Sequence, residues 1–275
     1  MNPKYVFLDI DGTLVGYNAE IPDSAITAIR KAQKNGHKMI IASGRSLGII
    51  YPKLLETISF DGIIASGGAE IIAGEETVFE SIISRKDMEF AVGYFRREGI
   101  HFVALSSDTL FAEKSFVEDT VPMLFELGFD RKLIEGAWGN PRIVDSILNA
   151  EKVQKFLFFF SPHDKEKLSL DLEGRFHITD YSVGKVNTDT LFGEMNLSGV
   201  NKATAIERFM EYSGAPIQDT VAIGDSGNDI EMIRLAGVGV AMGNATEEIK
   251  YAADFVTTAV DDNGIYNAFL KLGLI

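Results

Sequence analysis

Tyr5-Val6-Phe7-Leu8-Asp9-Ile10-Asp11-Gly12-Thr13-Leu14 is the stretch that decides the fold. Its apolar run ends at an Asp-x-Asp-Gly sequence, which predicts a buried strand that closes in a turn. Asp9 and Asp11 alternate at that end, so their side chains can project from one face of the chain at a spacing of roughly 7 Å. Two carboxylates placed so closely are costly unless a cation or a function offsets them, although Asp-Gly is also common in ordinary turns.

Strands and helices alternate after this stretch. The predicted elements are a helix over 24–35, a strand over 39–42, a helix to about residue 56, a strand over 62–65 and a hairpin over 71–79. The alternation returns after Asn201, with helices over 202–212, 229–235 and 246–252 and strands over 220–223 and 238–241. This order predicts an α/β fold with a Rossmann-like parallel sheet core flanked by helices.

The middle of the chain follows another pattern. Predicted strands come in neighbouring pairs there, over 102–105, 109–112, 153–160 and 175–179, with a helix over 87–97. Such a pattern is typical of an α+β domain inserted in the first one. The sequence therefore predicts a core domain of residues 1–83 and 189–275 and an inserted cap of residues 84–188.

A second acidic group, Gly224-Asp225-Ser226-Gly227-Asn228-Asp229, follows the predicted strand over 220–223. Its glycines permit tight turns, and its carboxylates are the hard oxygen ligands that Mg²⁺ prefers. Asp229 can equally cap the helix that follows. Because the carboxyl ends of parallel strands share one edge of a sheet, we expect Asp9, Ser43 and Asp225 to meet there.

Two weaker signals belong to the same edge. Ser43-Gly44 stands at a predicted strand-to-helix junction, where a hydroxyl and free N–H groups can hold phosphate oxygens, or where a plain helix cap can lie. Lys202 opens a predicted helix, although helix N-termini favour anions. A phosphate ligand would explain this lysine, and simple exposure to solvent is the alternative.

Four segments together resemble a known family. Asp9-Ile10-Asp11-Gly12-Thr13-Leu14, Ser43-Gly44-Arg45, Lys202 and Gly224 to Asp229 resemble, in order, the motifs of haloacid dehalogenase-type phosphatases. The segment from Glu194 to Lys202 further resembles the Cof-type subfamily, which carries a C2-type (IIB) cap between the second and third motifs. The resemblance covers the whole chain, and its motifs cover mostly the predicted core.

The resemblance implies a Mg²⁺-dependent phosphatase that acts on small phosphorylated metabolites, with sugar phosphates as the expected class. Asp9 would be the nucleophile that forms an aspartyl-phosphate, and Asp11 the general acid and base. The implied metal-site residues are Asp9, Asp11 through its main-chain carbonyl, Asp225 and, as support for the site or its lysine, Asp229. The implied phosphate-binding residues are Gly12, Ser43, Gly44, Lys202 and Asn228.

Departures and alternatives remain. Leu197, Ala203 and Ser66-Gly67-Gly68-Ala69 stand where many relatives carry proline, glycine and Asn-Gly-Ala, but none of these changes removes a reacting group. Arg45 is compatible with a phosphate or substrate contact and equally with a surface ion pair. A phosphomutase, which passes the same phosphoryl group to a sugar, and a non-catalytic phosphate-binding regulator are the alternative functions.

Composition limits the partners. The formal charge of −14 and the pI near 4.8 oppose nucleic-acid binding, and the absence of cysteine excludes thiolate metal sites and thiol nucleophiles. No apolar stretch reaches the length of a membrane span and no signal peptide is evident, so we expect a cytoplasmic protein, as a monomer or homodimer. Glycosylation sequons at Asn196 and Asn244 mean little without secretion.

Overall fold

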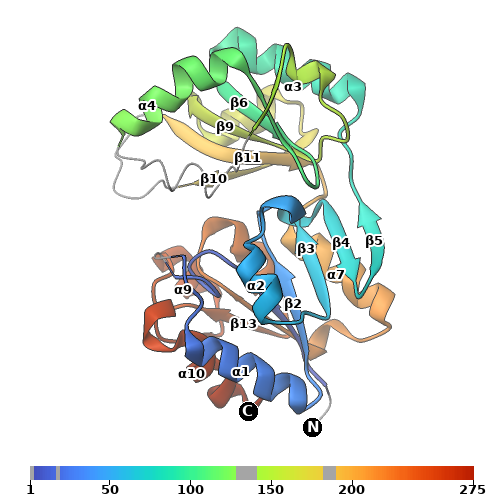
Figure 1. Cartoon of the computed structure of the whole chain (residues 1–275), viewed down its shortest axis with the longest axis vertical. Helices are drawn as coiled ribbons and strands as arrows, with labels where there is room; N and C mark the ends of the chain where they lie inside the picture. Colours follow the sequence, from blue (N-terminus) through green and yellow to red (C-terminus); the bar gives the residue numbers. More distant parts are fainter. Residues whose placement is uncertain (1–2, 17–18, 128–140, 182–189) are drawn as a thin grey trace. The chain divides into compact units, whose positions relative to one another are not determined.

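The computed structural model describes residues 3–16, 19–127, 141–181 and 190–275. The chain divides into two compact units (Figure 1). Unit 1 comprises residues 1–45, 50–80 and 201–275, and unit 2 comprises residues 46–49 and 81–200. Among the described residues, no helix is both long enough and apolar enough to cross a membrane.

Unit 1 is built on an eight-stranded sheet with the order β14-β13-β12-β1-β2-β3-β4-β5. Its strands are β1 (Tyr5–Leu8), β2 (Lys38–Ala42), β3 (Gly62–Ala65), β4 (Glu70–Ala73), β5 (Glu76–Glu80), β12 (Thr220–Gly224), β13 (Val238–Ala241) and β14 (Phe255–Val256). All neighbours from β14 to β3 pair in parallel, whereas β3, β4 and β5 pair antiparallel. The predicted Rossmann-like parallel core and the predicted hairpin are therefore confirmed.

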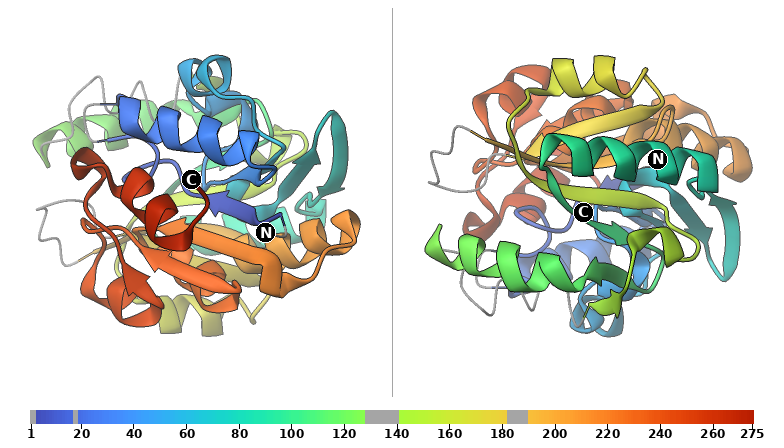
Figure 2. Two further views of the ribbon diagram at one scale, coloured as in Figure 1. Left: turned by 90° about the horizontal axis from the view of Figure 1, so that it is seen from below. Right: turned by 90° about the horizontal axis from the view of Figure 1, so that it is seen from above.

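Helices cover both faces of this sheet. They are α1 (Asp23–Lys34), α2 (Pro52–Thr57), α7 (Lys202–Ser213), α8 (Ile230–Leu235), α9 (Glu247–Ala252) and α10 (Gly264–Leu272). Helices α7, α8 and α9 pack on one face. There the rings of Phe7 and Phe209 pack edge to face, with their centroids 5.7 Å apart. Helices α1 and α10, far apart in the sequence, lie side by side (Figure 2). Since both faces are covered, β1 carries a continuous apolar run, and Val6, Phe7 and Leu8 are fully buried.

The predicted helix between Ser43 and residue 56 is wrong in its first half. A 3-10 turn (Leu47–Ile49) comes first, and α2 begins only at Pro52. Proline lacks the N–H that an ongoing helix needs, and it disfavours the helical conformation of the residue before it. Tyr51 accordingly has an extended ψ of 116° and precedes α2 as its N-cap residue.

Unit 2 is built on a six-stranded sheet with the order β10-β11-β9-β6-β7-β8. Its strands are β6 (His101–Leu105), β7 (Leu110–Glu113), β8 (Arg142–Val144), β9 (Lys155–Ser161), β10 (Phe176–Tyr181) and β11 (Leu191–Leu197). All neighbours are antiparallel except β7 and β8. Helix α3 (Arg85–Glu98) lies over one face of this sheet (Figure 1), together with α6 (Lys165–Asp171). A π-helical turn (Phe116–Thr120) and α4 (Val121–Glu126) pack on the other face.

The continuous apolar run of β9 explains this double burial, because successive side chains of a strand point to opposite faces. Phe156 and Phe158 pack beneath α3, while Phe159 packs against Phe116 of the π-helical turn. The sequence placed residues 189–201 with the core, but hydrogen bonding places β11 in the sheet of unit 2, between β9 and β10. The turn, α4 and β8 were not predicted, because short elements with mixed apolar content lack a clear period.

Candidate active site

The first acidic residue lies where the strand order of unit 1 reverses direction. Strand β1 pairs with β2 on one side and with β12 on the other, and Leu8 is in register with both Ile41 and Ile223. Asp9 follows at once, and its N–H donates to the Ile223 carbonyl at 3.1 Å. Chains that leave such a switch point in opposite directions open a crevice at the carboxyl edge of the sheet, where ligands bind.

Three buried carboxylates gather at this edge. Asp9, Asp225 and Asp229 each offer an oxygen atom within 4.8 Å of the others, and their exposed fractions are 5%, 9% and 0%. The structure thus brings together both acidic sequence groups. Burial, with the neighbouring carboxylates, raises the pKa of Asp9 well above its ordinary value and raises the pKa of Asp225 to about 7.

Lys202 is the cation within this group. Its ammonium donates to Asp9 Oδ1 at 2.7 Å and to Asp229 Oδ1 at 2.6 Å, and its side chain is 1% exposed. Burial alone would lower the pKa of Lys202, but the carboxylates of Asp229 and Asp9 raise it above its ordinary value. Simple exposure of this lysine is therefore excluded. It stands at the start of α7 because Asp9 and Asp229 lie there.

Both carboxylate oxygen atoms of Asp229 accept hydrogen bonds from other groups of the protein. Oδ1 accepts from Lys202, while Oδ2 accepts from the N–H groups of Asp225 at 2.9 Å and Ser226 at 3.0 Å. A reciprocal capping box with Ser226 completes the turn. Asp229 precedes α8 without capping that helix through its side chain, which instead closes the turn after Asp225 and pairs with Lys202.

Thr13 and Asn244, to which the sequence assigned no role in the site, hold Asp225 and the first turn. Thr13 Oγ1 donates to Asp225 Oδ1 at 2.9 Å. Gly12 has a φ of +87°, and a Cβ there would come within 2.2 Å of Asp225 Oδ2, so only glycine fits. Asn244 Nδ2 donates to the Gly12 carbonyl at 2.9 Å, while its Oδ1 accepts from the Val260 N–H. The sequence marked Asn244 only as a sequon, and no sequence pattern pairs it with Gly12.

The other predicted phosphate contacts are placed by their strands and turns. Ser43 follows β2 at the same sheet edge as Asp9, is buried, and accepts from the Arg45 N–H at 3.1 Å. Gly44 continues this loop, which is not the helix junction that the sequence predicted. Asn228 lies in the 3-10 turn before α8, and its Oδ1 accepts from Ser226 Oγ at 2.9 Å.

Asp11 lies apart from the carboxylate group. Its side chain is 49% exposed and accepts two hydrogen bonds from Arg45. Nε donates to Oδ2 at 2.7 Å, and Nη2 donates to Oδ1 at 2.9 Å. The Tyr51 hydroxyl also donates to Asp11 Oδ1, at 3.0 Å. Of the two alternatives for Arg45, the structure shows the ion pair. Burial and the Asp11 carboxylate raise the pKa of Tyr51 to about 12, so its hydroxyl stays protonated near neutrality.

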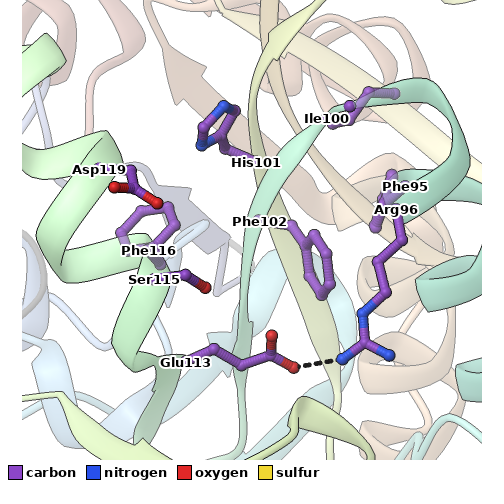
Figure 3. A pocket seen from close by; sticks show the side chains of 10 residues that line it. Phe95, Arg96, Ile100, His101, Phe102, Glu113, Ser115, Phe116 and Asp119 are labelled. Carbon is purple, nitrogen blue, oxygen red and sulfur yellow. Dashed lines mark hydrogen bonds and ion pairs between the residues drawn. The ribbon is translucent and has the colours of Figure 1, made fainter.

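Unit 2 contains a cavity of about 230 Å³ beside β6, β7 and the end of α3 (Figure 3). Aromatic rings of Phe95, Phe102 and Phe116 line it. Two of its charged groups pair within the unit, since Arg96 Nη2 contacts Glu113 at 2.7 Å. None of the residues predicted for the site lines this cavity.

Unit 2 also buries an ion pair between Lys155 of β9 and Glu194 of β11, with exposed fractions of 3% and 2%. Both side chains project from the sheet face opposite to Phe156 and Met195, which belong to the core beneath α3. Asn196 is buried on the same face as this pair and stands directly opposite Lys155. One face of the sheet of unit 2 is therefore partly polar.

Comparisons with known proteins agree on one family. Residues 6–269 match the haloacid dehalogenase-like hydrolase family. The chain is 30% identical over 276 residues to YkrA of Bacillus subtilis, with both chains covered completely. It is 27% identical to YcsE of the same organism, a 5-amino-6-(5-phospho-D-ribitylamino)uracil phosphatase, over 96% of this chain and 94% of that one.

Solved structures give the same result. BT1666 from Bacteroides thetaiotaomicron, one of the phosphatases of that superfamily, superposes with a TM-score of 0.81 at 27% identity, covering 99% of this chain and 96% of that one. BT4131, a sugar phosphatase of subclass IIB, superposes with a TM-score of 0.82 at 26% identity, covering 99% and 100%.

Proposed function

Because the chain belongs to the haloacid dehalogenase-like hydrolases, as an enzyme of the phosphatase type, we propose that it hydrolyses small phosphorylated metabolites through an aspartyl-phosphate on Asp9. The observation that carries this proposal is the burial of Asp9 against Lys202, with the ammonium 2.7 Å from Oδ1. A carboxylate is seldom buried without a partner or a task. Here the partner is a lysine that contacts two carboxylates at once.

The donor set fits Mg²⁺. The oxygen atoms of Asp9 and Asp225 lie within 4.8 Å of each other and both side chains are buried, which suits a small cation that prefers few carboxylates. We propose these two carboxylates and the Asp11 main-chain carbonyl as ligands. Asp229 supports them, since its oxygens already accept from Lys202 and from backbone N–H groups. A bound Mg²⁺ would supply positive charge that keeps the carboxylates ionised and offsets their repulsion of a phosphate dianion.

The reaction proceeds in two displacements at phosphorus. In the first, an Asp9 oxygen attacks in line, the bond to the leaving oxygen breaks, and Asp11 gives its proton to the departing alkoxide. In the second, Asp11 takes a proton from water, whose oxygen attacks phosphorus. The bond to Asp9 then breaks, which releases inorganic phosphate and restores both carboxyl groups.

Donors around Asp9 would hold the transferring oxygens. Lys202 is already in contact with Asp9, and Ser43 and Gly44 lie at the end of the adjacent strand β2. Backbone N–H groups near Gly12 and the Asn228 side chain would complete the set. Donors fixed in advance where charge spreads in the transition state are the main means of accelerating phosphoryl transfer.

We propose sugar phosphates as the substrate class and unit 2 as the part that selects among them. The relative BT4131 is a sugar phosphatase, and the sheet of unit 2 carries buried polar groups, Lys155, Glu194 and Asn196, of the kind that recognise hydroxyl groups. The net charge of −14 makes nucleic acid an unsuitable partner. We place the enzyme in the cytoplasm, where such metabolites occur.

The test is a panel of phosphorylated metabolites incubated with Mg²⁺, with release of inorganic phosphate as the readout. Asp9→Asn should abolish release, because an amide is a poor nucleophile. Asp23→Asn, which changes an exposed acid in the first turn of α1, should leave it unchanged. If the Asp9→Asn variant still released phosphate, Asp9 could not be the nucleophile. Exchange of sugar-phosphate isomers without free phosphate would instead show a phosphomutase.

A further inference from the structure

The hydrogen bonds that Arg45 and Tyr51 donate to Asp11 have no part in the two displacements at phosphorus. Resting on the proposed function, we infer that Arg45, backed by Tyr51, is a positioning residue that fixes the Asp11 carboxyl group for both of its proton transfers. All three residues belong to unit 1. The inference concerns a residue that touches the acid and base rather than one that touches phosphorus.

The contact between Arg45 and Asp11 fixes an orientation. Two roughly equal bonds, 2.7 Å from Nε and 2.9 Å from Nη2, join the guanidinium fork to the two carboxylate oxygens. Such a bidentate pair sets the plane of the carboxylate as well as its distance. Guanidinium does not release a proton at ordinary pH, so Arg45 orients Asp11 without exchanging protons with it. A lysine at this position would keep the charge and lose the fork.

Tyr51 fixes Arg45 in turn. The guanidinium carbon lies 4.0 Å from the centre of the Tyr51 ring, a cation–π stacking distance. Arg45 Nη2 donates to the Tyr51 hydroxyl at 2.6 Å, and that hydroxyl donates to Asp11 Oδ1 at 3.0 Å. Tyr51 itself is held by the start of α2 at Pro52. The three side chains form a closed ring of contacts.

The exposed fractions of the Arg45 and Asp11 side chains show which of the two is fixed by its surroundings. The Arg45 side chain is 13% exposed and the Asp11 side chain is 49% exposed. The buried arginine is therefore the fixed part, and the half-exposed aspartate is the part that would otherwise change rotamer freely. A general acid must lie within hydrogen-bonding reach of the leaving oxygen, so loss of orientation reduces the rate even when the carboxyl group is intact.

The chemistry of the leaving group separates this role from phosphate binding. A sugar alkoxide needs a proton from Asp11 when it departs, whereas p-nitrophenolate is stable enough to depart without one. Hydrolysis of the aspartyl-phosphate needs Asp11 as a base whichever ester formed it. A displaced Asp11 therefore slows both steps for a sugar phosphate and only the second step for p-nitrophenyl phosphate.

The experiment compares Arg45→Ala, Arg45→Lys and Tyr51→Phe with the unchanged enzyme, using a hexose phosphate that the enzyme turns over and p-nitrophenyl phosphate. For Arg45→Ala we expect kcat on the hexose phosphate to fall by about 10- to 100-fold with KM little changed, a part of the full contribution of an acid and base. With p-nitrophenyl phosphate, rapid quench should show a burst near one equivalent of nitrophenolate and phosphate trapped on Asp9, followed by slow turnover.

The variants form a series. Asp11→Asn should show the same burst with the largest loss, Arg45→Lys an intermediate loss, and Tyr51→Phe the smallest, because it keeps the ring beneath the guanidinium. Arg30→Ala, which removes an exposed arginine of α1 whose Nη2 donates to the backbone carbonyl of Thr57 at 2.9 Å, should match the unchanged enzyme. Arg45→Lys and Tyr51→Phe remove little volume, so their kinetics test the role of Arg45 even if Arg45→Ala folds poorly.

Two results would overturn the inference. If Arg45→Ala and Arg45→Lys slow the burst and raise KM equally for both esters, arginine binds the phosphate instead. If all three variants turn over both esters as the unchanged enzyme does, the grip on Asp11 has no role in catalysis. Failure of the unchanged enzyme to release phosphate or to label Asp9 would count against the proposed function itself, and the two failures are thus distinguishable.

Discussion

Replacement of Lys202 by methionine tests the energetics of the buried acidic group. Methionine has nearly the volume of lysine and no charge, so the change leaves Asp9 and Asp229 as two buried carboxylates without their shared cation. Removal of one partner from a buried pair typically costs about 3–5 kcal/mol. A chain of this size loses about 2–4 °C of melting temperature per kcal/mol, so we expect a fall of roughly 6–20 °C at pH 8 without Mg²⁺.

The matched control is Lys38→Met. Lys38 contacts Asp61 at 2.8 Å, almost the 2.7 Å that separates Lys202 from Asp9, but its side chain is 49% exposed against 1%. An exposed pair contributes about 0–1 kcal/mol. The two variants therefore share the length of the ion pair and differ in burial, and the difference between their effects measures what burial adds.

The assay is scanning calorimetry of each variant at pH 8 and pH 5. Lys202 lowers the pKa of Asp9, so its loss raises that pKa further; the folded protein then binds a proton that the unfolded chain releases, and its stability falls as the pH rises. The deficit of Lys202→Met should accordingly shrink at pH 5. Equal melting temperatures for the two variants at pH 8 would refute the reasoning, since the burial of Lys202 would then have no energetic effect.

Two further predictions concern the same site. Without Mg²⁺, the raised pKa values of Asp9 and of Asp225, about 7 for the latter against an ordinary 3.8, make the folded protein hold protons that the unfolded chain has released, so stability falls as the pH rises from about 4 to about 7. Added Mg²⁺ should therefore raise the melting temperature more at pH 8 than at pH 5 in thermal circular dichroism, and an equal increase would contradict this. Gly12→Ala should weaken Mg²⁺ binding in calorimetric titration by about 10-fold or more, because the new Cβ would displace Asp225. Gly36→Ala, with a φ of +92° and open space around it, carries only the backbone strain and should bind Mg²⁺ normally.

Sequence reasoning succeeded where the signal is local. The apolar run before Asp9 and the Gly-rich acidic turn after β12 each predict a strand and its end, and parallel topology then predicts that they meet. Long helices with a clear apolar period, such as α1 and α7, were predicted within a residue or two of their observed ends. The break at Pro52 was also readable, because proline rarely continues a helix, and it was missed.

Other features depend on contacts that no local pattern encodes. The burial of Lys202 follows from two carboxylates 193 and 27 residues away along the chain, so exposure could not be excluded beforehand. Tyr51 carries no motif and gains its role only from the stacking of Arg45. Asn244 reaches Gly12 across 232 residues. The residues of β11 were assigned to the core because the partners of this strand, β9 and β10, are identified by pairing rather than by sequence.

The position of β1 between β2 and β12 has a consequence for synthesis of the protein on the ribosome. The first strand emerges early, but β12 begins only at Thr220, so at about 5–20 residues per second one edge of β1 waits on the order of tens of seconds for its neighbour. During that time an apolar, unpaired edge is open to other nascent chains. Chaperones that shield this edge should therefore raise the yield of folded enzyme, and no nascent chain that ends before Asp229 can bring Asp9, Asp225 and Asp229 together.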